Sequence, residues 1–207
     1  GRRLLAVSRE MLYRMNILSM VYRMERKPEI LKRIDDEIKA VCDFSDWNPS
    51  HYLDVAEMSM AVAIAVDWVG EALPKSTVDL AIISLIEKGI KPSYQGTPGW
   101  LNGTNNWNQV CNGGMIAASI IIADRDPELA ARTISRSLAG MPNALKQYGP
   151  DGLYPEGATY WGYGTSFSVV TSSMLESAFG SDFGIAEYPA FLESADFRLL
   201  SEAPSGW

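Results

Sequence analysis

Residues His51–Leu73 read HYLDVAEMSMAVAIAVDWVGEAL, and their apolar side chains recur every three or four positions, as in an α-helix. The many Ala and Val residues imply that most faces of this helix are buried, which requires other elements around it. Ser50 directly precedes the segment and is expected to cap its N-terminus. This stretch therefore predicts a helix enclosed by the rest of the fold.

The same spacing continues in both directions from this segment, and almost nothing alternates as a strand would. Pro28 stands at a first-turn position, and Asp126–Pro127–Glu128 supplies a cap, a first-turn Pro and a first-turn acid. Further helices are expected over residues 3–27, 28–44, 74–91, 107–124, 127–148 and 165–180, with at most one short helix in the tail. The sequence thus predicts an all-α fold whose consecutive helices pair as antiparallel hairpins.

Two adjacent glycines, Gly113 and Gly114, stand inside one of these helical patterns. Each costs about 1 kcal/mol of helix stability relative to Ala. We expect that they are there because another helix approaches closely at this point.

The composition is that of a folded protein of one domain: 207 residues, 47% hydrophobic and 21% charged. A net charge of −7 argues against a nucleic-acid partner, and no apolar run is long enough to indicate a membrane partner. Cys42 and Cys111 lie in apolar helical patterns and are expected to be buried free thiols. With a single His and no Cys cluster, we expect no metal and no cofactor.

Long loops recur at alternate helix junctions, over residues 43–50, 92–106 and 149–157. If the hairpins are arranged around an axis, these loops lie at one end. They and the adjoining helix starts are rich in aromatic and amide side chains: Trp47, Asn48, His51, Trp100, Asn105, Asn106, Trp107, Asn108, Tyr154, Glu156, Tyr160, Trp161 and Tyr163. A shared rim of this composition is typical of a sugar-binding cleft, since rings stack on pyranose faces and amides bind hydroxyls. Alternatively, aromatic residues at helix ends simply cap a core.

Three stretches resemble the heparinase II/III-like polysaccharide lyases: DWNPSHYLDVAEM (46–58), NNWNQVCNGGM (105–115) and PDGLYPEGATYWGYG (150–164). The resemblance implies an incomplete (α/α) toroid followed by β-sandwich domains, with the active site between them. Residues 1–207 would then be a single helical domain, a truncated part of the toroid, that is inactive without the sandwich domains. The resemblance also implies an acidic polysaccharide as partner and a periplasmic or secreted location.

Such lyases cleave a uronic-acid glycoside by β-elimination, which removes the C5 proton next to a carboxylate. The carboxylate must be held, a base must take the proton, and an acid must protonate the leaving oxygen. The resemblance places Asn106 and Asn108 where the carboxylate partner lies, and Tyr160 and Tyr163 where the catalytic Tyr lies. The two tyrosines are three residues apart at a helix start, so both can face the same cleft.

The sequence departs from the family where many relatives have a His beside the motif Asn, because Trp107 follows Asn106 here. The one His in the chain, His51, is therefore a candidate catalytic group, although it can equally cap its helix with Asp54 nearby. Glu156 either binds a sugar hydroxyl or favours a helix N-terminus. The candidate substrate-binding residues are Asn105, Asn108, Trp107, Trp47, Asn48, Glu156 and Trp161.

Two other functions remain open. A glycoside hydrolase on an (α/α) barrel needs two carboxylates flanking the bond. The available acids are Asp54, Glu57, Asp151 and Glu156, but the sequence indicates no pair among them. The third possibility is a non-catalytic, carbohydrate-binding helical module.

Overall fold

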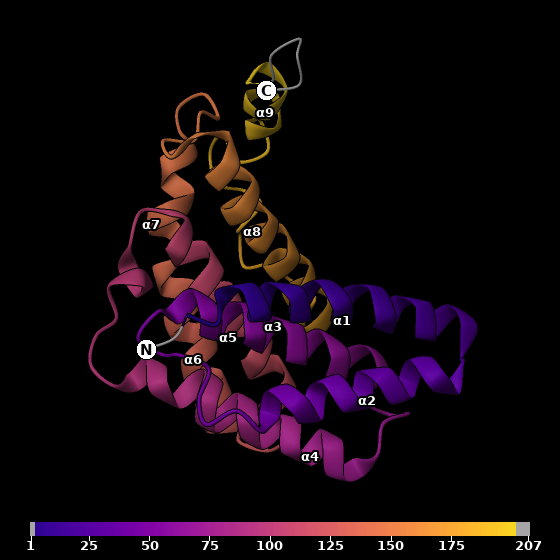
Figure 1. Cartoon of the computed structure of the whole chain (residues 1–207). Coiled ribbons are helices and arrows are strands. Elements are labelled where there is room, and N and C mark those ends of the chain that lie inside the picture. Colours follow the sequence, from indigo (N-terminus) through magenta and orange to yellow (C-terminus); the bar gives the residue numbers. More distant parts are fainter. Residues whose placement is uncertain (1–2, 202–207) are drawn as a thin grey trace. The chain divides into compact units, whose positions relative to one another are not determined.

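The computed structural model describes residues 3–201, and every regular element in this range is a helix (Figure 1). The α-helices are α1 (Leu5–Glu25), α2 (Pro28–Cys42), α3 (Tyr52–Val69), α4 (Lys75–Ser84), α5 (Asn106–Ile122), α6 (Pro127–Gly140), α7 (Pro142–Leu145), α8 (Gly157–Phe179) and α9 (Ser194–Leu200). The all-α prediction is confirmed, and the predicted toroid stays a prediction.

The chain forms two compact units, each of which is described by itself. The first contains residues 1–98 and 114–134, and the second contains residues 99–113 and 135–207. The boundary falls within α5 and within α6, so each of these helices contributes to both units. The three long loops are divided between the units, and their common rim stays a prediction.

In the first unit, α3 is the enclosed helix that the sequence predicts. All its residues from Tyr52 to Ala65 are buried. Its main neighbour is α1, whose buried face includes Met11, Met15 and Tyr22. The helix α2 runs antiparallel to α1, as Figure 1 shows, and buries Ile34 and Ile38. Both cysteines are buried, and neither forms a disulfide, as predicted.

The ends of two helices differ from the prediction. Ser50 does not cap α3, because its hydroxyl donates to Asn48 Oδ1 at 2.7 Å and His51 takes the N-cap position. The helix α4 ends at Ser84 and continues as a π-helix over Leu85–Ile90. Within the π-helix, the Lys88 ammonium donates to the carbonyl oxygens of Cys42 and Phe44. Lys88 thereby satisfies carbonyls at the C-terminal end of α2 and fixes the start of the 43–50 loop.

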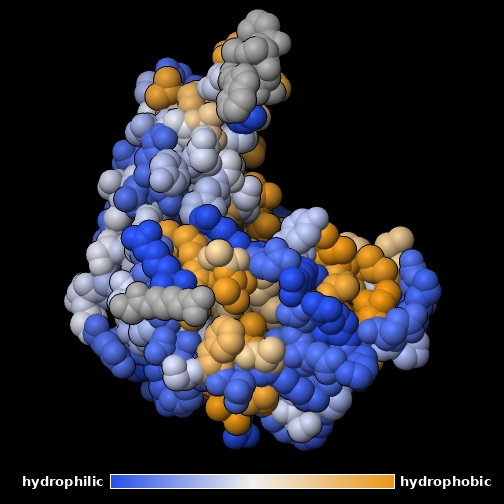
Figure 2. All heavy atoms as spheres, in the orientation of Figure 1, coloured by the Kyte–Doolittle hydropathy of each residue, from blue (hydrophilic) through white to orange (hydrophobic). Residues whose placement is uncertain are grey.

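A second face of α1 is exposed although it is apolar. Tyr13, Ile17, Met20 and Met24 follow one another at steps of four, three and four residues, and their exposed fractions run from 43% to 76%. In Figure 2, apolar surface is visible over the region where α1 and α2 run. The helix therefore has two apolar faces, of which only one packs on α3.

The second unit has an aromatic core. The Tyr148 ring lies 5.0 Å from that of Tyr154 and 5.1 Å from that of Phe191, measured between centroids. All three side chains are buried. The helix α8 begins at Gly157, earlier than the predicted start at residue 165, so the aromatic stretch after Glu156 is helical.

The glycine pair lies where helices meet, as predicted. A Cβ at Gly114 would lie 2.5 Å from the carbonyl oxygen and 2.7 Å from the Cα of Ala56 in α3. One at Gly113 would lie 2.6 Å from Thr171 Oγ1 in α8. Both positions therefore exclude a larger side chain.

We expect Gly114→Ala to lower the free energy of unfolding by about 1–3 kcal/mol, because the added methyl would overlap backbone atoms that cannot move aside easily. Gly162→Ala is the matched control within α8, since a Cβ there meets nothing within 4 Å. The control is expected to stabilise the chain by about 0.5–1 kcal/mol through helix propensity. Urea unfolding of both variants measures the effect. Equal effects of the two substitutions would show that the contact at Gly114 is not tight.

Candidate functional site

Hydrogen bonds between Asn106 and Glu156 join two of the three sequence motifs within the second unit. The backbone N–H of Asn106, the first residue of α5, donates to Glu156 Oε2 at 2.7 Å. Asn106 Nδ2 lies 2.9 Å from Oε1 and 3.0 Å from Oε2 of the same carboxylate. Glu156 thus caps the N-terminus of α5, although its own position is the N-cap of α8. The contact joins the beginnings of the two helices that carry the motifs.

A buried chain of hydrogen bonds continues from this carboxylate. The Tyr154 hydroxyl lies 3.2 Å from Glu156 Oε2 and donates to Gln109 Oε1 at 2.8 Å. Gln109 Nε2 donates to the Tyr148 hydroxyl at 2.8 Å and to Ser168 Oγ at 2.9 Å. Each hydrogen bond fixes the orientation of the next side chain, so the network from Tyr154 to Ser168 is rigid.

The two tyrosines of this hydrogen-bond network, Tyr148 and Tyr154, are suited to donate hydrogen bonds and are not suited to act as bases. Burial raises the pKa of Tyr154 far above its ordinary value, and the nearby Tyr148 and Glu156 raise it further. Burial also raises the pKa of Tyr148. Because a buried phenolate is unfavourable, both hydroxyls stay protonated at neutral pH.

The candidate catalytic tyrosines lie in the first two turns of α8, beyond Glu156. Tyr160 is 49% exposed. Tyr163 is half-buried, and its ring packs edge-on against Phe167 at 5.6 Å between centroids. Trp161, between them, donates from Nε1 to Ser194 Oγ at 2.9 Å, beside α9. Tyr160 is therefore the most exposed of the three tyrosines in the motif.

The other candidates of the NNWNQ motif differ in exposure. Asn105 is exposed and Trp107 is half-buried. Asn108 is buried, and its Nδ2 donates to the carbonyl oxygens of Trp100, Leu101 and Gly140 at 2.9–3.2 Å. One turn further along, Asn112 Nδ2 also donates to the Leu101 carbonyl oxygen, at 3.2 Å. Asn108 thus holds the preceding loop in place, and its amide donor faces protein carbonyls.

In the first unit, the buried carboxylate of Asp54 gathers three donors. It lies 2.5 Å from His51 Nδ1, and it accepts hydrogen bonds from Asn48 Nδ2 at 2.7 Å and the Leu4 backbone N–H at 2.6 Å. Asp54 is fully buried, and the His51 side chain is 19% exposed. A carboxylate at Nδ1 orients an imidazole and places its proton on that nitrogen in the neutral form. The arrangement is compatible with both roles considered for His51, a contact at the start of α3 and an oriented catalytic imidazole.

A hollow of about 550 Å³ opens beside this cluster. Its lining comes from the 43–50 loop and from Leu4, and includes Asn48, which is 8% exposed. Trp47 is fully buried, and its Nε1 donates to the Val41 carbonyl oxygen at 2.9 Å. A ring that stacks on a sugar must expose a face, so the position of Trp47 fits a core role.

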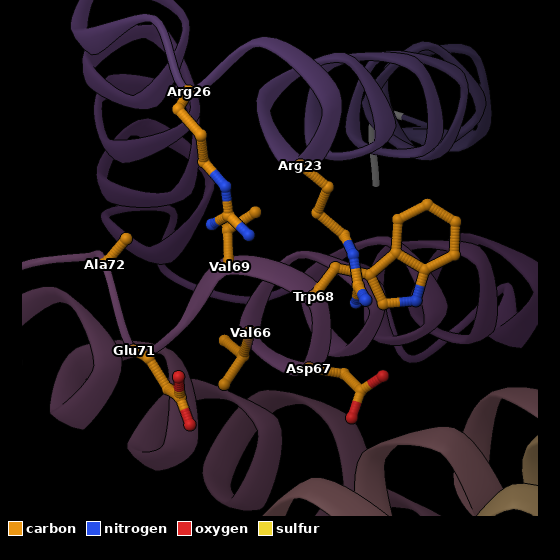
Figure 3. Close-up of a pocket in the computed structure, with 8 residues that line it drawn as sticks. All are labelled: Arg23, Arg26, Val66, Asp67, Trp68, Val69, Glu71 and Ala72. Carbon is orange, nitrogen blue, oxygen red and sulfur yellow. The ribbon is translucent and has the colours of Figure 1, made fainter.

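Another hollow in the first unit, of about 470 Å³, lies where the C-terminal ends of α1 and α3 meet, and no sequence motif pointed to it. Figure 3 shows Arg23 and Arg26 reaching from α1 toward the end of α3. The lining residues are Arg23, Arg26, Val66, Asp67, Trp68, Val69, Glu71 and Ala72. Positively charged side chains at a helix C-terminus interact favourably with the helix dipole, which accounts for the two arginines here.

Among residues 3–201, no group of three or more His, Cys, Asp or Glu side chains is arranged to hold a metal ion. Nor is any helix in that range both long and apolar enough to span a bilayer. The sequence matches no protein-family model, and no curated protein is significantly similar to it. The likeness to the heparinase II/III-like lyases therefore depends on the three motifs alone.

Several polar side chains in or near the sequence motifs have a role that was not predicted. Gln109, Tyr148, Thr165 and Ser168 complete the network that ends at Glu156, with Tyr148 and Thr165 hydroxyls 2.7 Å apart. Gln109 and Ser168 are polar residues at positions where the helical pattern requires burial, which is the signal that marks them.

Proposed function

We propose that the chain belongs to a polysaccharide lyase that cleaves uronic-acid-containing polysaccharides by β-elimination. The observation that carries the proposal is the set of hydrogen bonds between Asn106 and Glu156, because it joins the motif of the carboxylate partner to the motif of the catalytic Tyr. β-Elimination requires the carboxylate partner and the catalytic Tyr to contact the same sugar residue of the substrate.

In this proposal Asn106 binds the uronate carboxylate and stabilises the enolate-like intermediate, as neutral donors do in an oxyanion site. Tyr160 or Tyr163 protonates the leaving glycosidic oxygen and, in its ionised form, takes the C5 proton. His51 and Asn48 lie in the first unit, and their part in the site stays a prediction. Trp107, Trp161 and Asn105 are proposed to contact neighbouring sugars.

Two of the four acids considered for a hydrolase are inaccessible. Asp54 is fully buried with three donors on its carboxylate, and Glu57 is 1% exposed and paired with Arg9. Neither carboxylate is therefore accessible to a glycosidic bond, whereas a hydrolase needs two such groups beside it. The other two candidates lie on one loop, where Asp151 is exposed and Glu156 accepts hydrogen bonds from Asn106.

The test is incubation with alginate, heparan sulfate and hyaluronan while ultraviolet absorbance is followed. A lyase leaves a C4–C5 double bond that absorbs, and a hydrolase does not. We expect absorbing product from the protein that carries the β-sandwich domains implied by the resemblance. The 207-residue chain alone is expected to bind oligouronates weakly without turnover, because half a cleft admits water and orients substrate poorly.

Reducing ends without ultraviolet absorbance would contradict the proposal in favour of a hydrolase. Binding without any cleavage by the longer protein would favour a non-catalytic module. Comparable rates from the 207-residue chain and the longer protein would contradict the proposed need for a second wall of the cleft.

A further inference from the structure

We propose that Glu156 occupies a carboxylate-binding subsite that a ligand's carboxylate enters when the Glu156 side chain leaves. The subsite consists of the Asn106 backbone N–H and the Asn106 side-chain amide. That its ligand is a uronate rests on the proposed function, whereas its preference for a carboxylate follows from the donors alone.

The first argument is the convergence of donors on one anion. Glu156 accepts from the Asn106 N–H at 2.7 Å and from Nδ2 at 2.9 and 3.0 Å, and the Tyr154 hydroxyl lies 3.2 Å from it. A helix cap requires only one acceptor at the backbone N–H. Here the Asn106 side-chain amide donates to the same carboxylate in addition. Since Glu156 forms no ion pair within residues 3–201, neutral groups alone hold it, and another carboxylate can replace it.

The second argument is that, in the part of the chain that the structure describes, an unpaired hydrogen-bond acceptor lies beside these donors. Asn106 is 2% exposed, and its Oδ1 has no hydrogen-bond partner within residues 3–201. A buried carbonyl oxygen without a donor is unfavourable, and a ligand hydroxyl would relieve this. Donors for a carboxylate next to an acceptor for a hydroxyl match a uronic acid, which carries both groups on adjacent carbons.

The third argument is that Glu156 can leave without disturbing the core. Its side chain is half-buried, and Pro155 before it is exposed. Gly157 after it has φ +82°, and a Cβ there would meet nothing within 4 Å. The Tyr154 hydroxyl keeps its hydrogen bond to Gln109 Oε1 at 2.8 Å when Glu156 departs. The exchange therefore requires only rotation of the Glu156 side chain.

The test is a calorimetric titration of the 207-residue chain with sodium glucuronate. We expect Glu156→Ala to bind glucuronate at least tenfold more tightly than wild type, because the internal competitor and its charge are both removed. Glu156→Gln should show a smaller gain, since its amide still fills the space. D-Glucose, which lacks the carboxylate, should show no gain with either variant.

Asp151→Ala is the matched control, because Asp151 is an exposed acid on the same loop and contacts the Leu153 N–H, not Asn106. It should bind glucuronate like wild type, which separates loss of the competitor from a general loss of negative charge. An Asp151→Ala gain equal to that of Glu156→Ala, or no gain with either Glu156 variant, would overturn the proposal.

A wild-type measurement covers the case in which the Glu156 variants do not fold. Glucuronate should shift the backbone and side-chain amide resonances of Asn106, while D-glucose should not. Unchanged Asn106 resonances at saturating glucuronate would overturn the proposal. A gain in glucuronate affinity in the 207-residue chain, together with no ultraviolet-absorbing product from the longer protein on any of the three polymers, would leave the subsite in place and reject the lyase function.

Discussion

Replacing the proposed catalytic tyrosine with Phe is expected to lower kcat for the proposed uronate cleavage by roughly 100- to 10,000-fold, the usual contribution of a general acid or base. The expectation applies to Tyr160→Phe or Tyr163→Phe in a protein that also carries the β-sandwich domains implied by the resemblance. Phe keeps the ring and removes only the hydroxyl that transfers the proton. The ultraviolet assay gives the rate, and circular dichroism shows whether the helices persist.

The surroundings of the Tyr160 and Tyr163 rings indicate that substitution by Phe leaves the fold stable, so that a loss of activity would report on catalysis. Tyr160 is 49% exposed, so its hydroxyl contributes little to packing. The edge-on contact of Tyr163 with Phe167 depends on the ring, which Phe retains. Tyr13→Phe is the control, since Tyr13 is 65% exposed on α1 and belongs to none of the three motifs. Normal turnover in both Tyr160→Phe and Tyr163→Phe would eliminate the proposed acid–base role.

Asp54→Ala is expected to lower the free energy of unfolding by about 3–5 kcal/mol, the range for breaking a buried charged contact. The substitution leaves His51, Asn48 and the Leu4 N–H without the acceptor they share, and each unpaired buried donor carries its own cost. Asp54→Asn should lose less, because one acceptor oxygen remains. Chemical denaturation followed by circular dichroism measures both.

Asp67→Ala provides the comparison on the same helix, as Asp67 is exposed near the end of α3. Its effect should lie within about 0.5 kcal/mol of zero. If Asp54→Ala were no more damaging than Asp67→Ala, the three contacts of Asp54 would contribute nothing to stability. His51 would then lack the support that its proposed role requires.

Helices were predictable because their signals are local. Pro28 begins α2, and the Asp126 carboxylate accepts the Leu129 N–H at 3.0 Å at the start of α6, as the capping pattern requires. The π-helix over Leu85–Ile90 was not predictable in this way. Lys88 reaches carbonyls more than forty residues earlier in the chain, at Cys42 and Phe44, and nothing in its own neighbourhood indicates this contact.

The candidate site was predictable only in part for the same reason. The motifs identified Asn106 and Glu156, but the spacing of fifty residues between them says nothing about a hydrogen bond. Glu156 was expected to bind a sugar hydroxyl or to favour a helix N-terminus, and it caps α5, which its position in the sequence does not indicate. Exposure was equally unpredictable, since Trp47 and Trp107 look alike in sequence, yet one is fully buried and the other half-buried.

The hydrogen bond from Asn112 to the Leu101 carbonyl also bears on how the protein ages. Asn followed by Gly is chemically fragile, because the next backbone nitrogen can attack the side-chain amide and convert Asn to Asp or isoaspartate. Asn112–Gly113 is such a pair, but it is buried within α5, where the helix keeps that nitrogen away from the amide. Asn102–Gly103 has the same composition, and Asn102 is exposed at the end of the short 3-10 helix over Gly99–Asn102. Isoaspartate at residue 102 therefore accumulates with storage time, whereas isoaspartate at residue 112 records that α5 has unfolded.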